Sequence, residues 1–443
     1  MIFKWLTGTS PSRIIIASTM ITVFIGTTLL LLPISHTIPL SFINALFVAI
    51  SAITASGLTP VNLESLTPFG IVTVTVLMQI GSLGIIILTL FIAHVFFTPR
   101  RPAKKIAAEL LGIKRKRDTR RMLIFVIALT LAVELLGAIF LFTSIRFELP
   151  LLEAIFSSIF HSISAFTNTG FALSKESMIY YSRSPIVLIT LSTLMVLGGI
   201  GFTTLKEAIL YISSFTQKIR YKFSLSSRII WRTTFVLIAC SFLLCLTLEH
   251  NHAFAGMNGV NSALNALFYV VSSMGTGLHT VAVSATRVPT LLLIMVIAYI
   301  GGSPGSAGSG IKTTTVAIIF SALRSVIKGK KHVILRGQRI DIGQVTKSIA
   351  MISLSIPFII IIAFLLLTTD ATFTLLDCLF ETVSGFANMG ISTGITPRLN
   401  IIGKLLICIT MLVGRVGMFT LIFSIKPLKE TKEKALQKRN KLS

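Results

Sequence analysis

Long apolar runs alternate with short basic segments along the chain, and this pattern predicts helices that span a membrane. A helix needs about 20 consecutive apolar residues to cross a bilayer. The runs that we expect to open a pair of spans lie near residues 14–33, 122–145, 232–249 and 348–369. Those that we expect to close a pair lie near 70–97, 185–211, 289–323 and 400–425. Four pairs of spans are therefore predicted.

Each predicted pair encloses a third apolar piece of only about a dozen residues, which is too short to cross a bilayer. The four pieces read SFINALFVAISA, EAIFSSIFHSIS, NSALNALFYVVSS and LLDCLFETVSGF. We interpret them as re-entrant segments that enter the membrane and turn back to the same side.

Each short piece leads into a loop in which a glycine is followed by an apolar residue. The loops read TASGL (54–58), TNTGF (167–171), MGTGL (274–278) and ANMGI (387–391). Their glycines are Gly57, Gly170, Gly277 and Gly390. Because the intervals between them are 113, 107 and 113 residues, the chain has the period of a duplicated architecture. The predicted repeats are 14–97, 122–213, 232–323 and 348–425, followed by a basic tail, 426–443.

Glycine pairs with two residues between them also recur, in the spans that close three of the repeats. The pairs are Gly81 and Gly84, Gly198 and Gly201, and Gly414 and Gly417. Small residues in membrane helices commonly let two helices approach closely. We therefore favour helix packing over a direct role in transport for these pairs.

The composition supports a membrane protein, since 53% of residues are hydrophobic and only 12% are charged. The net charge of +25 would suggest nucleic-acid binding in a soluble protein. Here 32 of the 40 Lys and Arg residues fall in five segments, at 1–13, 100–121, 206–232, 324–347 and 426–443. Basic segments between spans mark the cytoplasmic side of a membrane. We therefore expect both termini in the cytoplasm and no nucleic-acid partner.

The four glycine loops suggest a chemistry. Irregular backbone survives at membrane depth only where it is buried in protein or lines a watery cavity. Four similar loops around one axis would form a ring of carbonyl oxygens, which can replace the water shell of an alkali cation. The residues expected to form this ion site are Thr54, Ala55, Ser56, Gly57, Thr167, Asn168, Thr169, Gly170, Gly275, Thr276, Gly277, Asn388, Met389 and Gly390.

Four motifs then resemble a known family. These are QIGSLG (79–84), LGGIGF (197–202), IGGSPGSAGSGIKTTT (300–315) and VGRVG (413–417), and they resemble the Trk/Ktr/HKT superfamily of potassium-uptake subunits over nearly the whole chain. The length resembles the Ktr-type membrane subunit. The resemblance implies an all-α membrane protein with eight transmembrane helices and four re-entrant pore helices around one central pore.

The resemblance also implies the cargo and the partners. The ion would be K⁺, held by filter carbonyls, because glycine is kept in all four loops. The partners would be a second copy of the chain in a homodimer, membrane lipid and a cytosolic ring that binds nucleotide. The chain itself would carry no cofactor. The expected location is the bacterial plasma membrane.

The run GGSPGSAGSGIKT (301–313) is close to a phosphate-binding loop, but Ile311 intrudes before the lysine and no strand precedes the run. The resemblance instead implies an intramembrane gate over 301–312. We expect Ser303 and Pro304 to end the helix before it, since proline disfavours helix in the preceding residue. The gate residues expected are Gly301, Gly302, Ser303, Gly305, Ser306, Gly308, Ser309, Gly310, Lys312 and Arg415.

Arg415 is included because of its depth. Gly301 and Gly414 each stand 24 residues after the filter glycine of their own repeat, so Arg415 should lie level with the start of the gate loop. An arginine within a membrane needs polar partners, and we expect the loop carbonyls and the hydroxyls of its serines to supply them.

Several alternatives remain open from the sequence. One is a cation-coupled secondary transporter with broken helices, although the repeats here all run in the same direction. Another is a relative that conducts or depends on Na⁺. No residue set suggests catalysis, so we expect no enzyme activity. We expect Glu134 to be a buried, hydrogen-bonded structural group and not a proton relay. We expect His161 and His279 to be packing or lining residues, and Glu381 to lie near the ring.

Overall fold

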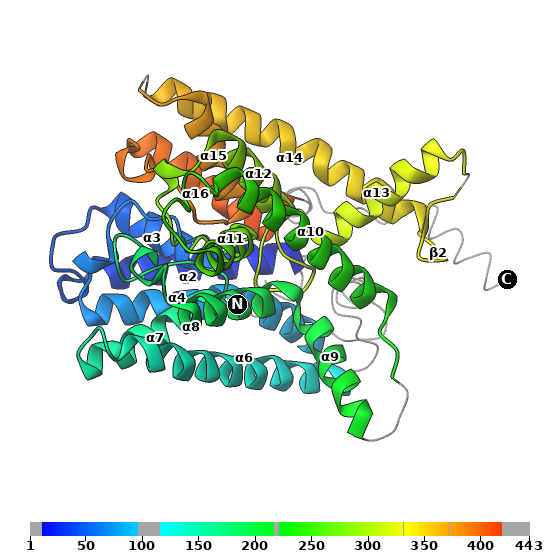
Figure 1. The fold of residues 1–443 in the computed structure, drawn as a ribbon, viewed down its shortest axis with the longest axis horizontal. Helices are drawn as coiled ribbons and strands as arrows, with labels where there is room; N and C mark the ends of the chain where they lie inside the picture. Colours follow the sequence, from blue (N-terminus) through cyan, green and yellow to red (C-terminus); the bar gives the residue numbers. More distant parts are fainter. Residues whose placement is uncertain (1–10, 96–115, 217–220, 331, 371, 419–443) are drawn as a thin grey trace, which may run out of the picture.

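The computed structural model describes residues 11–95, 116–216, 221–330, 332–370 and 372–418. The predicted basic tail, 426–443, and the last residues of the first and fourth predicted repeats lie outside these ranges. The described chain is mostly helical. Figure 1 shows the long helices α6 and α14 along two opposite edges of the molecule, with α13 and the strand β2 at one end.

The helices follow one order four times: an opening helix, a short helix and a closing helix. The opening helices are α2 (Pro11–Leu31), α6 (Lys116–Ile145), α10 (Leu225–Glu249) and α14 (Ile342–Thr369). The short helices are α3 (Phe42–Thr54), α7 (Leu151–Phe166), α11 (Gly259–Ser273) and α15 (Leu375–Ala387). The closing helices are α4 (Pro68–Val95), α8 (Pro185–Ile200) with α9 (Phe202–Thr216), α12 (Val288–Ile300) with α13 (Thr313–Ile327), and α16 (Ile401–Val416).

Short 3₁₀ helices and one hairpin complete the described chain. They are η1 (Pro33–Ser35), η2 (Leu63–Ser65), η3 (Ile179–Tyr181), η4 (Val283–Ala285), η5 (Thr396–Arg398), β1 (Ile334–Leu335) and β2 (Gln338–Arg339). The strands are antiparallel, with Ile334 opposite Arg339.

The short helices were predicted to within two residues at each end. Among the described residues, α6, α10 and α14 are long and apolar enough to cross a membrane by themselves. The predicted span over 185–211 is broken in the structure, because α8 and α9 meet at an angle of 107°. Gly201 lies between them with φ of +101°, a backbone conformation that ends a helix and that glycine adopts at little cost.

Polar caps set where three of the short helices begin. Ser41 caps α3, and the side chain of Asn258 accepts the N–H of Asn261 at 2.8 Å at the start of α11. Thr374 and Asp377 form a reciprocal capping box on α15. Such caps satisfy N–H groups that the first turn of a helix leaves free.

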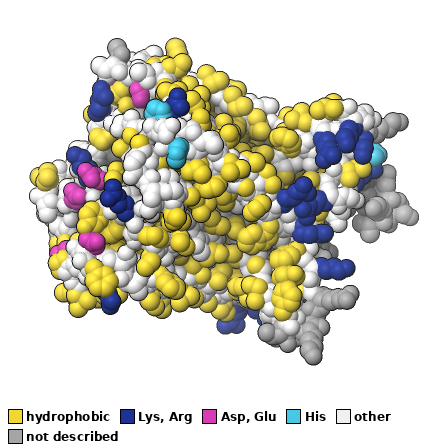
Figure 2. All heavy atoms as spheres, in the orientation of Figure 1, with side chains coloured by type: hydrophobic (Ala, Val, Ile, Leu, Met, Phe, Trp, Pro, Cys, Tyr) yellow, Lys and Arg dark blue, Asp and Glu magenta, His cyan; other side chains and the backbone are white. Residues whose placement is uncertain are grey.

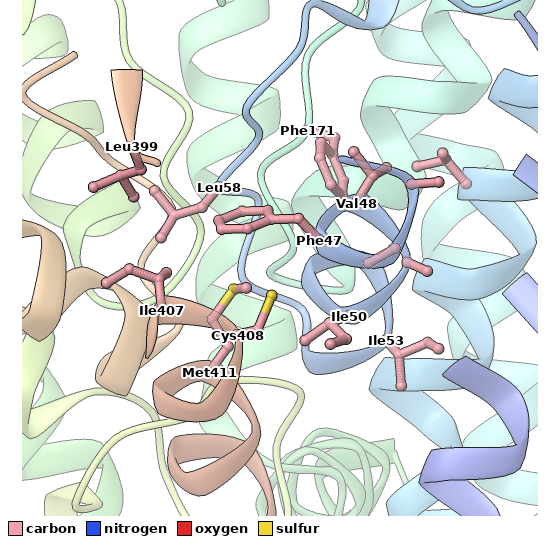
Figure 3. Packing of buried hydrophobic residues seen from close by; sticks show 14 of the residues in the cluster. Phe47, Val48, Ile50, Ile53, Leu58, Phe171, Leu399, Ile407, Cys408 and Met411 are labelled. Carbon is pink, nitrogen blue, oxygen red and sulfur yellow. The ribbon is translucent and has the colours of Figure 1, made fainter. Parts of the chain in front are cut away.

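The four repeats close into a ring. Each short helix packs against the closing helix of the repeat before it: α7 against α4, α11 against α8, and α15 against α12. The short helix α3 of the first repeat packs against α16 of the last, which completes the circle. Figure 3 shows Phe47 and Ile50 of α3 facing Cys408 and Met411 of α16 within one buried apolar cluster.

The exterior is apolar in the middle and charged at the ends. Figure 2 shows hydrophobic side chains across the middle of one face. Large apolar side chains of α10 and α14, such as Phe235, Leu243 and Phe364, are exposed. Lys and Arg side chains gather at the end near α13, and the acidic side chains visible on this face lie at the opposite end. This surface is typical of a protein surrounded by lipid.

Candidate functional site

The four glycine loops share one backbone geometry. In each loop, the residue before the glycine donates its N–H to the carbonyl of a serine in the preceding short helix. The pairs are Ser56 with Ser51 (2.9 Å), Thr169 with Ser164 (3.0 Å), Thr276 with Ser272 (2.8 Å) and Met389 with Ser384 (2.8 Å). The same bond therefore fixes all four loops below their helices.

Positive φ angles recur at two places in each loop. The glycines have φ of +82°, +78°, +90° and +88° in chain order. Two residues earlier, Ala55, Asn168, Gly275 and Asn388 also have positive φ. The left-handed region costs an L-residue about 1–2 kcal/mol, which glycine avoids. This cost explains why glycine is kept where the loop turns most sharply.

The loops contact one another in a closed circle. A Cβ atom placed on Gly57 would overlap the carbonyl oxygen of Thr169 in the second loop. A Cβ on Gly170 would overlap the carbonyl oxygen of Thr276 in the third. The same holds for Gly277 with Met389, and for Gly390 with Ser56, which returns to the first loop. Each glycine therefore leaves room for a carbonyl of the next repeat.

The fourteen residues predicted for the ion site thus lie in these four loops, and all are buried except Gly170 and Gly390, which are partly buried. Hydroxyl groups brace two of the loops: Ser164 donates to the carbonyl of Phe171 at 2.7 Å, and Ser272 to that of Leu278 at 2.5 Å. The side-chain oxygens of Ser51 and Ser384 have no partner among the described residues. The ring is therefore braced more firmly in the second and third repeats.

The glycine pairs in the closing helices serve close packing, as expected. A Cβ on Gly81 would overlap the carbonyl oxygen of Ile53, near the end of α3. A Cβ on Gly198 would likewise overlap the carbonyl oxygen of Phe166, and a Cβ on Gly414 that of Phe386. The first glycine of each pair thus lets a closing helix touch the end of a short helix, directly below the ring.

The second glycine of the pair has a role that the sequence did not reveal. Gly201 and Gly417 have positive φ and directly follow the last residues of α8 and α16. The adjacent glycines in LGGIGF could have indicated such a break, because glycine weakens a helix interior. In the second and fourth repeats, the closing helix therefore ends just below the ring.

The predicted gate loop does separate two helices, α12 and α13. The prediction that Ser303 and Pro304 end the first of them is wrong, because α12 ends at Ile300 and Gly301 follows with φ of +67°. Glycine in a left-handed conformation is a common helix terminator and acts here three residues before the proline.

The loop folds back on itself. The N–H groups of Ile311 and Lys312 donate to the carbonyls of Tyr299 and Ile300 at 3.1 and 2.9 Å. The ammonium group of Lys312 donates to the carbonyl of Gly308 at 2.6 Å. The lysine is therefore occupied by the loop's own backbone, whereas a phosphate-binding lysine must face its ligand.

The loop also docks on the break between α8 and α9. Ser303 and Ala307 donate their N–H groups to the carbonyls of Gly199 and Gly198, at 2.9 and 3.0 Å. In return, the N–H of Phe202 donates to the carbonyl of Gly305 at 3.0 Å. The two broken closing helices thus satisfy each other's free backbone groups, as buried backbone requires.

Arg415 contacts the loop, as the spacing of the repeats predicted. Its Nη1 donates to the carbonyl of Ala307 and to the hydroxyl of Ser309, the latter at 3.2 Å. Its Nη2 donates to the carbonyl of Gly81 at 2.9 Å. Of the predicted serine partners, only Ser309 has a hydrogen bond to Arg415 within the described residues. The arginine of the fourth repeat therefore links the first repeat to the loop of the third.

Asn168 connects the ring to the loop, which sequence reasoning missed. With its amide nitrogen towards the hydroxyl of Thr276, at 2.6 Å, its oxygen accepts the N–H of Gly199 at 3.1 Å. Gly199 is also an anchor of the gate loop. One side chain thus connects two of the glycine loops with Gly199 of α8, on which loop 301–312 rests.

The ionisable groups near the ring have structural partners. Gln79 donates to the carboxylate of Glu134 at 2.7 Å, as expected for a structural group. Nδ1 of the His161 imidazole lies 2.8 Å from the carbonyl oxygen of Ser157, and its Nε2 accepts the N–H of Leu173. The expectation that His161 is a packing residue is therefore confirmed.

Two other expected residues lie beside the glycine loops. His279 places Nδ1 3.4 Å from the carbonyl of Gly277. The buried carboxylate of Glu381 accepts the hydroxyls of Ser392, at 2.8 Å, and of Thr396. Glu381 therefore lies near the ring, as expected, and holds the segment that follows the fourth glycine loop.

Asp370, which follows α14, carries a negative charge at neutral pH. The backbone N–H of Thr372 donates to this carboxylate at 2.9 Å and its hydroxyl at 2.8 Å. These hydrogen bonds hold the pKa of Asp370 below its usual range. The residue can therefore attract cations to this end of the molecule.

The geometry so far describes four backbone loops in a closed circle, next to a loop that separates α12 from α13. Residues 7–433 match the model of the TrkH family, whose members are described as cation transport proteins. The chain belongs to this family. The superfamily indicated by the sequence motifs is thereby confirmed.

Two bacterial proteins named as potassium uptake proteins match most of the chain. The protein is 33% identical over 422 residues to the Ktr system potassium uptake protein B of Vibrio alginolyticus, covering 93% of this chain and 90% of that one. It is 30% identical over 434 residues to the protein of the same name from Bacillus subtilis, with coverages of 96% and 94%.

A solved structure supports the fold. The crystal structure of the potassium transporter TrkH from Vibrio parahaemolyticus matches with a TM-score of 0.74 at 19% identity, covering 95% of this chain and 86% of that one. At this level of identity, the likeness establishes the fold alone.

Proposed function

We propose that the protein takes up K⁺ through a filter formed by the four glycine loops. The observation that supports this most is the circle of contacts in which each filter glycine makes room for a carbonyl of the next repeat. Such a ring can coordinate a dehydrated cation without burying a fixed charge. The relatives named potassium uptake proteins agree with K⁺ as the cargo.

The finer architecture belongs to the same proposal. Eight transmembrane helices and four re-entrant pore helices would surround the central pore, in four repeats over 14–97, 122–213, 232–323 and 348–425. The basic end of the molecule, near α13, would face the cytoplasm of a bacterial cell. Both termini would then lie in the cytoplasm.

Conduction would be gated by residues 301–312 together with Arg415. The loop has hydrogen bonds to α8, to Arg415 and to itself, so several separate contacts hold it where it lies. The protein would work as a homodimer on a cytosolic ring that binds nucleotide. The name of the relatives, as parts of a Ktr system, supports a partner subunit. No cofactor would reside on this chain.

The test is ion uptake by a bacterial strain that lacks its own potassium uptake. We expect cells that produce this protein to accumulate K⁺ and Rb⁺ and to admit Na⁺ much more slowly, because a carbonyl ring discriminates between these ions. Equal entry of Na⁺ would identify a sodium-conducting relative instead. Uptake of K⁺ that stops without external Na⁺ would favour a coupled transporter.

A further inference from the structure

A large groove lies between α10, α13 and the hairpin β1–β2, apart from the ring and the loop. Its deep part is lined by apolar side chains, including Val236, Cys240, Val316 and Phe320, and reaches Ile300 at the end of α12. Arg232 lies eight residues before Cys240 on α10, which corresponds to about 12 Å along a helix. The groove therefore runs some way into the apolar layer.

The other part of the groove is strongly basic. Its lining includes Arg232, Arg324, Lys328, Lys330 and Arg336, and no acidic residue. All five are exposed. None of them has an ion pair with a carboxylate among the residues that the structure describes. Figure 2 shows Lys and Arg side chains grouped at this end of the molecule. Five positive charges thus lie together without a counter-charge.

The hairpin brings one of these charges to the groove. Arg336 and Gly337 form the two-residue turn between β1 and β2, with φ of +50° and +80°. Two successive positive φ angles are typical of the tight turn that joins short antiparallel strands. The turn presents Arg336 to the same space as Arg232 and Arg324, which come from two different helices.

We propose that this groove binds an anionic phospholipid. The guanidinium groups of Arg232 and Arg324 would hold the phosphate, since arginine matches phosphate oxygens with paired donors. An acyl chain would lie along the apolar part, towards Cys240 and Val316. Basic pockets between membrane helices on the cytoplasmic side are suited to anionic headgroups.

The shape and charge of the groove favour a lipid over other occupants. A free phosphate would leave the apolar part uncovered. A second copy of this chain would bring the same basic surface, with a net charge of +25 on each copy. A soluble partner would not reach the apolar side chains beside the middle of α10. Only an amphiphile with a net negative head complements both parts.

The groove touches both sides of the helix break that contains the predicted gate. Ile300 is the last residue before that loop, and Val316 lies in the first turn after it. A bound lipid would therefore brace α13 against α10. This consequence rests on the proposed function, whereas lipid binding itself does not.

Native mass spectrometry of the purified full chain in neutral detergent tests the binding. We expect phosphatidylglycerol to bind at least about tenfold more tightly than phosphatidylcholine, because several basic residues act together on an anionic headgroup. The variant Arg232→Gln/Arg324→Gln should lose this preference. The variant Arg228→Gln/Arg339→Gln should keep it, because these residues are exposed at the same end but do not line the groove.

Cys240 reports whether the acyl chain occupies the groove. It is the exposed cysteine, whereas Cys245, Cys378 and Cys408 are buried. Phosphatidylglycerol should slow modification of Cys240 by N-ethylmaleimide in the parent and control proteins, and not in Arg232→Gln/Arg324→Gln. Equal binding of both lipids, or no protection of Cys240, would overturn the proposal. If Cys240 is instead protected by a higher concentration of this protein or by added cytosolic ring, and not by lipid, the groove binds a protein.

Discussion

Gly170→Ala is expected to remove most K⁺ uptake and the preference for K⁺ over Na⁺. The new Cβ would overlap the carbonyl oxygen of Thr276, so this oxygen must leave its place in the ring. The backbone at Gly170 has φ of +78°, which adds about 1–2 kcal/mol of strain for alanine. We expect a loss of at least about tenfold in K⁺ flux, since about 1.4 kcal/mol corresponds to that factor.

Gly256→Ala is the matched control. Gly256 lies between α10 and α11 with φ of +79°, but a Cβ there would meet nothing within 4 Å. It therefore carries the same backbone strain without displacing a carbonyl, and its K⁺ flux and selectivity should match the parent protein. Gly→Ser at Gly57, Gly277 and Gly390 should act like Gly170→Ala. If all four filter variants fold and discriminate K⁺ from Na⁺ as the parent does, the loops are not the filter.

Loss of the contacts between Arg415 and the loop is expected to raise K⁺ flux. The shorter, neutral side chain in Arg415→Gln cannot reach Gly81 and Ala307 together, so the loop is held less firmly. The variant also removes a positive charge that we expect to repel cations. A hydrogen bond from a charged donor contributes about 1.5–3 kcal/mol, so an increase of about tenfold or more is expected in the absence of the regulatory ring. Flux into proteoliposomes measures this directly.

Further variants separate the causes. Removal of residues 305–308 should raise flux as well, because it takes out the carbonyls of Gly305 and Ala307 that accept from Phe202 and Arg415. Arg415→Lys keeps the charge but not the paired donors, so it should raise flux less than Arg415→Gln if charge contributes. Arg398→Gln, in the same repeat and bonded to Thr372, should change nothing. If the loop and Arg415 variants fold and conduct no faster than the parent, Arg415 only pins the repeats together.

The ring could be predicted from the sequence because its determinants are local and repeated. A left-handed backbone position demands glycine wherever a neighbouring carbonyl fills the place of Cβ, so Gly57, Gly170, Gly277 and Gly390 recur at nearly equal intervals. The level of Arg415 followed from the same intervals. The repeated intervals thus predicted the level of a residue in the molecule as well as the fold.

The breaks in the closing helices could not be placed in this way. Glycines inside membrane helices more often serve packing, so composition did not distinguish Gly198, which packs, from Gly201, which ends α8. Likewise, α12 ends at Ile300, next to Gly301, and not at the predicted Ser303 and Pro304. The partners of Arg415 and Asn168 come from other repeats, and no pattern within one repeat specifies them.

The location of a bound cation is the most direct test of the ring. Crystals of the protein grown in RbCl and measured at the rubidium absorption edge would locate the ion by anomalous scattering. A peak on the axis among the carbonyl oxygens of Ser56, Thr169, Thr276 and Met389 is the expected result. A peak beside Glu134 or Glu381, with none on that axis, would contradict a carbonyl filter and favour a coupled carrier.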